Sequence, residues 1–308
     1  MNTDKEKNFV SAVIYVRNNA QTIRAFLDHV YSRLEQLFSD FEIICVNDAS
    51  KDDSEEQIRI FAADKDHAVT LVKMGYPQGT ELSMNAGEEI AIGDFVYEFD
   101  LAEQSWPEDM IDQLYRKMQE GYDIISACPQ GGGRASSRFF YGVFNKYSSL
   151  NTNLRTEAFR LVSRRAINRV AAMTQVQIYK KAANANTGLR QTYIEYQPEQ
   201  NRFKDRKSSK ERRGLAMDSL LLFTDIGYKI ALITSIVMLV FAAIVGIYTV
   251  VIYAAGHPVE GWTPIMIFLA IGFFALFASL SFVIKYLSLI LNLHFRRQRY
   301  VVQDVEKL

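Results

Sequence analysis

The chain has 308 residues and carries 35 basic and 35 acidic side chains, so its formal net charge at pH 7 is zero. This balance argues against a nucleic-acid-binding protein, because such proteins depend on an excess of positive charge. Hydrophobic residues make up 49% of the chain, which excludes a disordered protein, and two cysteines with four scattered histidines offer neither a disulfide framework nor a zinc site.

The first two hundred residues alternate between apolar, β-branched runs and segments with helical spacing. The runs predict strands at 9–16, 41–46, 69–74, 95–100, 122–129, 158–162 and 193–197, and the spacing predicts helices at 20–37, 54–63, 80–92, 107–120, 138–150 and 164–172. This alternation is typical of a doubly wound α/β sheet, whose ligands bind at the carboxyl ends of the strands. Four polar side chains are expected at that edge: Asn47, Asp48, Lys73 and Asp100.

Two long apolar runs follow this part of the chain. Residues 230–256 and 261–284 contain no Asp, Glu, Lys or Arg, and each is long enough to cross a hydrocarbon core of ~30 Å. The short link between them predicts an antiparallel hairpin, and two buried core helices of a soluble domain are the alternative. We therefore expect an α/β domain at 1–200, a basic and amphipathic segment at 201–228, two transmembrane helices within 229–295 (about 230–255 and 263–290), and a tail at 296–308.

Basic residues flank the two apolar runs and predict their orientation. Lysines and arginines crowd 202–213 and 296–299, whereas the link between the runs has none. By the positive-inside rule, the α/β domain and both termini are then expected to face the cytoplasm. The stretch at 214–229 reads as an amphipathic helix on the inner leaflet, or as a helix packed on the soluble domain. The apolar helices also offer a surface for association between copies of the chain.

Two aspartates stand where chemistry is expected. Asp48 and Asp100 each follow an apolar strand and precede a polar loop, where a carboxylate can hold a ribose, a base or a metal ion. Asp48 is equally suited to capping the next helix. Asp100 is followed by Glu103 and Gln104, and hard cations take several oxygen ligands while leaving other positions to phosphates. A metal role is therefore favoured for Asp100.

The order of FVSAVIYVRNN, FEIICVNDASKDDS, MNAGEEIAIGDFVYEFD and FDLAEQSWPEDM resembles the family 2 glycosyltransferases, which have a GT-A-type, Rossmann-like nucleotide-sugar domain. With two trailing transmembrane helices, the chain is similar to the polyprenyl-phosphate branch, which includes dolichol-phosphate mannose synthases and bactoprenol glucosyltransferases. The resemblance implies transfer of a sugar from a nucleotide sugar, expected to be UDP-linked, to a polyprenyl phosphate such as undecaprenyl phosphate. The expected setting is the cytoplasmic face of a bacterial inner membrane, for cell-surface glycan, O-antigen or teichoic-type modification.

The resemblance also implies roles for particular residues. The expected nucleotide-sugar-binding residues are Asn47, Asp48 and Asp94, joined by Lys73 at the same sheet edge. Asp100, Glu103 and Gln104 are the implied ligands of Mg²⁺ or Mn²⁺, and Asp100, Glu157 and Arg160 the implied catalytic residues. The implied contacts to the lipid phosphate and the diphosphate are Arg202, Lys204, Arg206 and Lys210.

Several departures from the family pattern leave the activity open. Ala102 stands in place of the second Asp of Asp-x-Asp, Asn47 in place of the first Asp of the base loop, and Ala158 in place of a second acid. Either Asp100, Glu103 and Gln104 hold the metal with help from the diphosphate, or metal binding is weak, or catalysis has been lost. The last case describes a scaffold that binds a nucleotide sugar without turnover. A further alternative keeps the enzyme but changes the lipid-linked acceptor.

Overall fold

The computed structural model describes residues 5–131, 154–173, 180–198, 262–295 and 300–308, together with isolated positions at 142, 145 and between 233 and 244. The chain divides into two compact units. The first comprises Met1–Lys146, Leu150–Leu215 and Gln298–Leu308, and the second comprises Tyr147–Ser149 and Ala216–Arg297. The last residues, expected as a separate tail, therefore belong to the first unit.

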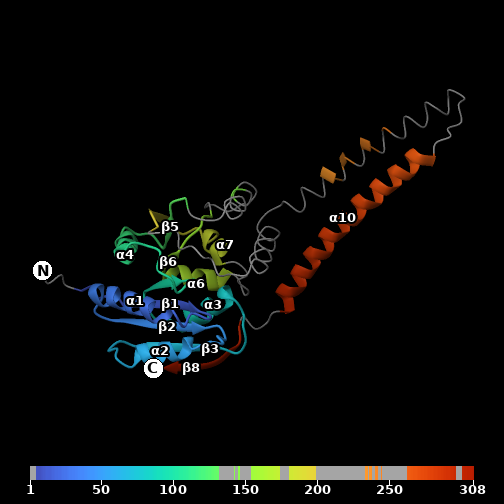
Figure 1. Cartoon of the computed structure of the whole chain (residues 1–308). Coiled ribbons are helices and arrows are strands. Elements are labelled where there is room, and N and C mark those ends of the chain that lie inside the picture. The colour runs from blue at the N-terminus through green and yellow to red at the C-terminus, as the bar shows by residue number, and fades with distance from the viewer. Residues whose placement is uncertain are drawn as a thin grey trace, which may run out of the picture. The chain divides into compact units, whose positions relative to one another are not determined.

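The first unit is built on an eight-stranded mixed sheet in the order β7-β5-β6-β4-β1-β2-β3-β8 (Figure 1). The strands are β1 Val10–Val16, β2 Phe41–Asn47, β3 Val69–Met74, β4 Phe95–Phe99, β5 Ile124–Pro129, β6 Phe159–Ser163, β7 Gln191–Tyr196 and β8 Val302–Lys307. β1 pairs in parallel with β2 and β4, and β2 with β3. β6 runs antiparallel to β4 and β5, and β8 antiparallel to β3. The predicted parallel centre of the sheet is confirmed. The two antiparallel strands, β6 and β8, make the sheet mixed.

Helices cover both faces of this sheet. The described helices of the unit are α1 Ile23–Leu37, α2 Ser54–Ala62, α3 Thr80–Ile90, α4 Met110–Gln119, α6 Arg164–Met173 and α7 Lys180–Ala185. On one face, Ala12 and Ile14 of β1 join a core with residues of α1, α2 and α4, while Val13 joins a second core with residues of α3. β1 is thus buried on both sides, which is why its sequence is apolar throughout rather than alternating.

Two elements were not predicted, α7 and β8. The sequence of β8, VQDVEK, is half charged and carries no continuous apolar run, so it reads as a polar tail. It is nevertheless the edge strand beside β3 (red in Figure 1). Edge strands are exposed on one side and commonly carry charged residues, which hides them from a pattern search. The helix predicted at 138–150 lies outside the described residues apart from positions 142 and 145.

The second unit contains α10, which runs from Trp262 to Phe295 and confirms a helix over the segment expected at about 263–290. Counted over the residues whose placement the structure describes, no helix combines the length and the apolar character of a membrane span. The other predicted span at 230–255 is described at isolated positions only. The segment at 201–228 and the link at 257–261 lie outside the described residues.

Gly93 precedes β4 and lies against the start of β1. A Cβ at this position would be 2.5 Å from the backbone nitrogen of Ser11 and 2.8 Å from the carbonyl carbon of Val10. The guanidinium of Arg164 also holds this turn, since Nη2 donates to the Gly93 carbonyl at 2.7 Å and to the Ala91 carbonyl at 2.6 Å. The glycine of the Gly-Asp pair before β4 thus allows the chain to pack closely against the start of β1.

We therefore expect Gly93→Ala to lower the free energy of unfolding by about 1–3 kcal/mol, because backbone of β1 must move to admit the methyl group. The measurement is the urea midpoint of the variant against that of the wild-type chain. Gly142→Ala is the matched control, because nothing lies within 4 Å of a Cβ at Gly142. Equal midpoints for the two variants would contradict the close approach at Gly93.

Candidate active site

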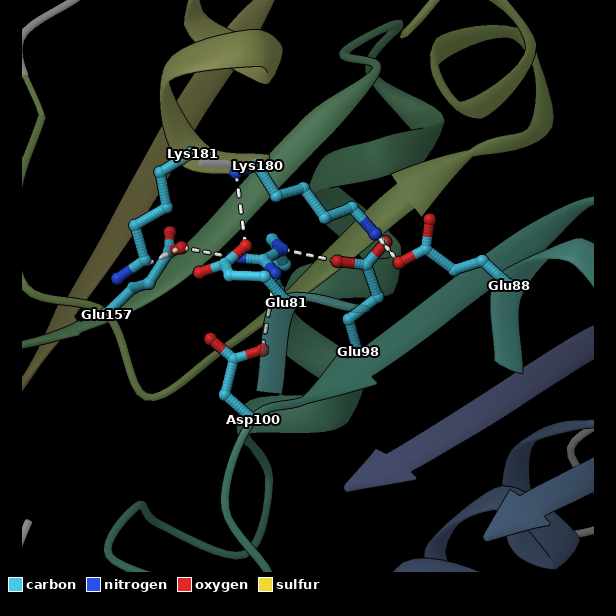
Figure 2. Close-up of polar contacts among 8 residues, drawn as sticks. Glu81, Glu88, Glu98, Asp100, Glu157, Lys180 and Lys181 are labelled. Carbon is cyan, nitrogen blue, oxygen red and sulfur yellow. Dashed lines mark hydrogen bonds and ion pairs between the residues drawn. The ribbon is translucent and has the colours of Figure 1, made fainter. Parts of the chain in front are cut away.

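Several charged side chains converge at the carboxyl end of β4. Asp100 directly follows this strand, and the antiparallel pairing of β6 brings the start of β6 to the same edge. In that register Glu98 of β4 is the cross-strand partner of Arg160 in β6. Figure 2 shows that side chains of α3, β4 and α7 meet those of Asp100 and Glu157 at this point.

Arg160 is the centre of the cluster. It is 3% exposed, and its guanidinium binds three carboxylates. Nε donates to Glu98, Nη1 donates to Glu157 Oε1 at 2.5 Å, and Nη2 donates to Asp100 Oδ1 at 3.3 Å. Burial by itself lowers the pKa of Arg160, but the three carboxylates raise it well above its ordinary value. The guanidinium is therefore a permanent positive charge held in a fixed orientation.

Two lysines at the start of α7 complete the cluster. Lys180 Nζ donates to Glu98 Oε1 at 2.7 Å and pairs with Glu88 of α3, and its backbone N–H donates to Glu81 Oε2 at 3.1 Å. Lys181 Nζ lies 3.3 Å from Glu157 Oε1 (Figure 2). Burial lowers the pKa of Lys180 and raises that of Glu98, because it disfavours the charged form of each. Burial alone therefore favours the neutral form of both groups, and the direct contact between Lys180 and Glu98 favours their charged forms.

The pKa of Glu157 reflects the positive charges that surround its carboxylate. Burial raises its pKa, but the charges of Lys181 and Arg160, with hydrogen bonds from Ser126 and Arg160, outweigh burial and bring the pKa to about 2. The folded-state value lies below the ordinary 4.5, so the ionised carboxylate stabilises the fold above pH 4.5. This contribution, roughly 3 kcal/mol, is lost as the pH falls toward 2.

We expect the unfolding free energy of the wild-type chain to fall more steeply below pH 4.5 than that of Glu157→Gln, which has no carboxyl to protonate. Urea unfolding at several pH values from 5 to 3 measures both slopes. Parallel curves would show that Glu157 is not held ionised by its neighbours.

The base-loop aspartate is fully enclosed. Asp48 is 0% exposed and accepts hydrogen bonds from the backbone N–H groups of Gln78 at 2.7 Å and Gly79 at 3.0 Å. Tyr15 donates its hydroxyl to Asp48 Oδ2 at 2.9 Å, and Arg17 Nη1 lies 3.4 Å from the same oxygen. The helix that follows, α2, begins after Asp53, so Asp48 does not cap it. The carboxylate instead joins the ends of β1 and β2 to the loop before α3.

The other residues expected to bind the donor lie in different places. Asn47 ends β2, where its Oδ1 accepts from the Ser50 backbone N–H at 3.1 Å. Lys73 is the residue before the last of β3 and pairs with two carboxylates, Glu55 at 2.8 Å and Glu306 at 2.5 Å. Asp94 precedes β4 and Asp100 follows it, so the two aspartates lie at opposite ends of this strand. A five-residue strand separates these two aspartates, and Asp94 does not join the cluster.

Two of the predicted metal ligands, Asp100 and Gln104, contact other groups of the protein. Asp100 is engaged by Arg160, Ala102 is 2% exposed within the hydrophobic core and supplies no oxygen, and the amide of Gln104 donates to the Trp106 carbonyl at 3.3 Å. Among the described residues, no group of three His, Cys, Asp or Glu side chains is placed to hold a metal ion. Arg160 contacts one oxygen of Asp100, and the assignment of Asp100, Glu103 and Gln104 as ligands of a divalent cation stays a prediction.

Five members of the cluster were not predicted from the sequence: Glu81, Glu88, Glu98, Lys180 and Lys181. Glu98 left a signal, since it is the one charge inside the apolar run FVYEF. The others lie on segments with ordinary helical composition and left none. The basic residues expected to contact lipid phosphate, namely Arg202, Lys204, Arg206 and Lys210, lie outside the part of the chain that the structure describes.

The chain is similar to proteins of one family of enzymes. The family model described as Glycosyl transferase family 2 matches residues 11–184. The chain is 25% identical over 295 residues to an uncharacterized glycosyltransferase of Synechocystis sp., covering 91% of each chain. It is 28% identical over 193 residues to a prophage bactoprenol glucosyl transferase homolog of Escherichia coli, covering 61% of this chain and 62% of the relative.

One further relative and one solved structure are similar to parts of this chain. An undecaprenyl-phosphate 4-deoxy-4-formamido-L-arabinose transferase of Aeromonas hydrophila is 35% identical over 124 residues, which are 40% of this chain and 37% of the relative. A mannosyltransferase from Pyrobaculum calidifontis, solved with GDP-Man and Mn²⁺, matches with a TM-score of 0.50 at 17% identity, over 70% of this chain and 63% of that one. The latter likeness shows a shared GT-A-like mixed α/β fold.

Proposed function

Because the chain belongs to glycosyl transferase family 2 and is a glycosyltransferase, we propose that it transfers a sugar from a UDP-linked donor to a polyprenyl phosphate. The observation that carries this proposal is the cluster of Asp100, Glu157 and Arg160 at the carboxyl edge of the sheet, where sheets of this kind bind ligands. The acceptor is inferred from relatives whose names specify bactoprenol and undecaprenyl phosphate.

The sheet topology supports a site for the donor across three strand ends. Asp48 follows β2 and Asp100 follows β4, and β1 lies between these strands. With neighbouring strands ~4.8 Å apart, the two aspartates are separated by about 10 Å. We place the nucleoside at the Asp48 end and the diphosphate and sugar at the Asp100 end.

The proposed reaction is a displacement at the anomeric carbon of the sugar. The bond from this carbon to the diphosphate breaks, a bond to an oxygen of the lipid phosphate forms, and the nucleoside diphosphate leaves. A phosphate monoester has its second pKa near 6, so the attacking oxygen is already ionised at pH 7 and needs no general base. Ala158, which stands where the family pattern has an acidic residue, is therefore compatible with activity.

Charge balance indicates what the donor requires beyond this cluster. Among the described residues of the cluster, five carboxylates (Glu81, Glu88, Glu98, Asp100 and Glu157) face three cations (Arg160, Lys180 and Lys181), so 5 − 3 leaves two formal negative charges. A diphosphate needs additional positive charge at such an edge. We propose that a divalent cation, Mg²⁺ or Mn²⁺, or the basic residues at 202–210 supply it.

We also propose that the second unit anchors the enzyme in a membrane, with the catalytic unit on the cytoplasmic side. The uncharged runs at 230–256 and 261–284 support this proposal, as do the large apolar side chains of α10 that are exposed, such as Phe274 at 78%. A cysteine introduced at 257–261 should react with a membrane-impermeant thiol reagent from outside intact cells. Reaction only after permeabilisation would overturn this orientation.

The decisive experiment uses the purified full chain in detergent with undecaprenyl phosphate and a panel of UDP-sugars, with added Mn²⁺ and with EDTA. Formation of a lipid-linked sugar is the expected result. Calorimetric binding of UDP-sugars without any transfer would instead identify a nucleotide-sugar-binding scaffold. Transfer to a lipid-linked glycan, with none to undecaprenyl phosphate, would keep the enzyme and change the acceptor.

A further inference from the structure

The loop between β3 and α3 is held from two sides. On one side, the backbone N–H groups of Gln78 and Gly79 donate to the two oxygens of Asp48. On the other, the Gln78 side chain forms a pair of hydrogen bonds with the backbone of Val301: Nε2 donates to the Val301 carbonyl at 2.7 Å, and the Val301 N–H donates to Oε1 at 2.9 Å. The backbone N–H of Gly75 also donates to the Val301 carbonyl at 3.0 Å.

Val301 is itself held in place by the strand that follows it. β8 pairs antiparallel with β3, and Glu306 forms ion pairs with Lys73 and Arg59. Before the strand, the Tyr300 hydroxyl donates to Glu89 of α3. The C-terminal residues are thus joined to β3, α2 and α3, although in sequence they follow α10.

A carboxamide suits this contact because it presents one donor and one acceptor side by side, as a peptide group of a neighbouring strand does. A glutamate at position 78 would keep the acceptor but lose the donor to the Val301 carbonyl. Asp48, at the far end of the same chain of contacts, is fully buried, and a buried carboxylate depends on the donors that surround it. The position of the Gln78 backbone therefore bears directly on the position of Asp48.

We propose that Val301 is a structural part of the donor site, acting through Gln78, which positions the loop that holds Asp48. The inference rests on the proposed function, in which Asp48 lies at the nucleoside end of the donor. Gln78 is a positioning residue, and the last residues of the chain contribute to nucleotide affinity without touching the nucleotide. The preorganised loop lowers the cost of ordering the site when the donor binds.

The test measures binding of UDP and of GDP by calorimetry, using the full chain in detergent at a temperature at which all variants are folded. Gln78→Met keeps the side-chain length and the backbone donor to Asp48 but removes both hydrogen bonds to Val301. Val301→Pro removes the N–H donor and leaves Gln78 unchanged. We expect each variant to raise the dissociation constant for the preferred nucleotide roughly tenfold, with the KM for the lipid acceptor unchanged.

The double variant separates a positioning role from general loss of stability. If Gln78 acts through Val301, the double variant has the same dissociation constant as Gln78→Met alone, whereas independent effects multiply. Gln113→Met is the matched control, because Gln113 is a half-buried glutamine of α4 whose side chain donates to Asp109 at the start of its own helix. Wild-type affinity in Gln78→Met, or multiplied effects in the double variant, would overturn this inference alone. Absence of nucleotide binding in the wild-type chain would overturn the proposed function and the inference with it.

Discussion

Asp100→Asn is expected to lower the turnover number for sugar transfer by about a hundredfold or more, while the urea midpoint of the variant stays close to that of the wild-type chain. The substitution keeps the size of the side chain and removes its charge. Loss of one preorganised electrostatic group in an active site typically costs a factor of about 10²–10³. Asp100 is 20% exposed and touches Arg160 through one oxygen at 3.3 Å, so the fold has other supports at this point.

The matched control is Asp94→Asn, which makes the same change at an exposed carboxylate before β4. Asp94 Oδ2 accepts one hydrogen bond, from the Phe9 backbone N–H at 3.3 Å, and Asp94 lies at the other end of β4. We expect this variant to keep its turnover number. Equal losses in the two variants would show that the site extends to Asp94, and full activity of Asp100→Asn would remove Asp100 from the catalytic residues.

Arg160→Ala is expected to destabilise the chain by about 3–5 kcal/mol, since it leaves buried carboxylates without their common cation. Glu98 is the most affected, because it lies within the sheet and is 0% exposed. Glu157 retains Lys181, and Asp100 has partial access to solvent. The expected measurement is a large fall in the urea midpoint, accompanied by loss of transfer activity.

Arg155→Ala provides the comparison for this prediction. Arg155 forms an ion pair with Glu195 at 2.8 Å, with the two side chains 45% and 43% exposed. Exposed pairs of this kind contribute about 0–1 kcal/mol, so the control should unfold close to the wild-type midpoint. If both arginine variants lose the same small amount, the buried network around Arg160 is not a determinant of stability.

The central strands could be predicted from the sequence because burial on two faces leaves a strong local signal. In β1 every residue except Tyr15 is fully buried, and the run FVSAVIYV shows this directly. Asp48 and Asp100 were found for a related reason: each directly follows such a run, so its place at the carboxyl edge follows from the strand itself. The boundaries of β1, β2, β3 and β4 accordingly differ from prediction by one residue at most.

The charged cluster was only partly predictable, because its contacts depend on how distant elements pair. Arg160 meets Glu98 through the register between β6 and β4, and Lys180 reaches Glu98 and Glu88 because α7 begins beside them. The sequence around Lys180 is that of a solvent-exposed helix, yet the side chain is buried. No local pattern specifies a register, so the contact between Asp100 and Arg160 could be seen only in the tertiary structure.

By itself, the sequence determined the parallel core of the sheet and the place of two aspartates at the carboxyl ends of its strands, since both follow from short runs of residues whose burial is a local property. Only the tertiary structure decided the role of the last residues. β8 is polar and has no preference for a particular partner in its own sequence, and it becomes a strand because β3 presents an unpaired edge. That pairing places Val301 against Gln78 and so connects the C-terminus to Asp48, across more than two hundred residues of chain.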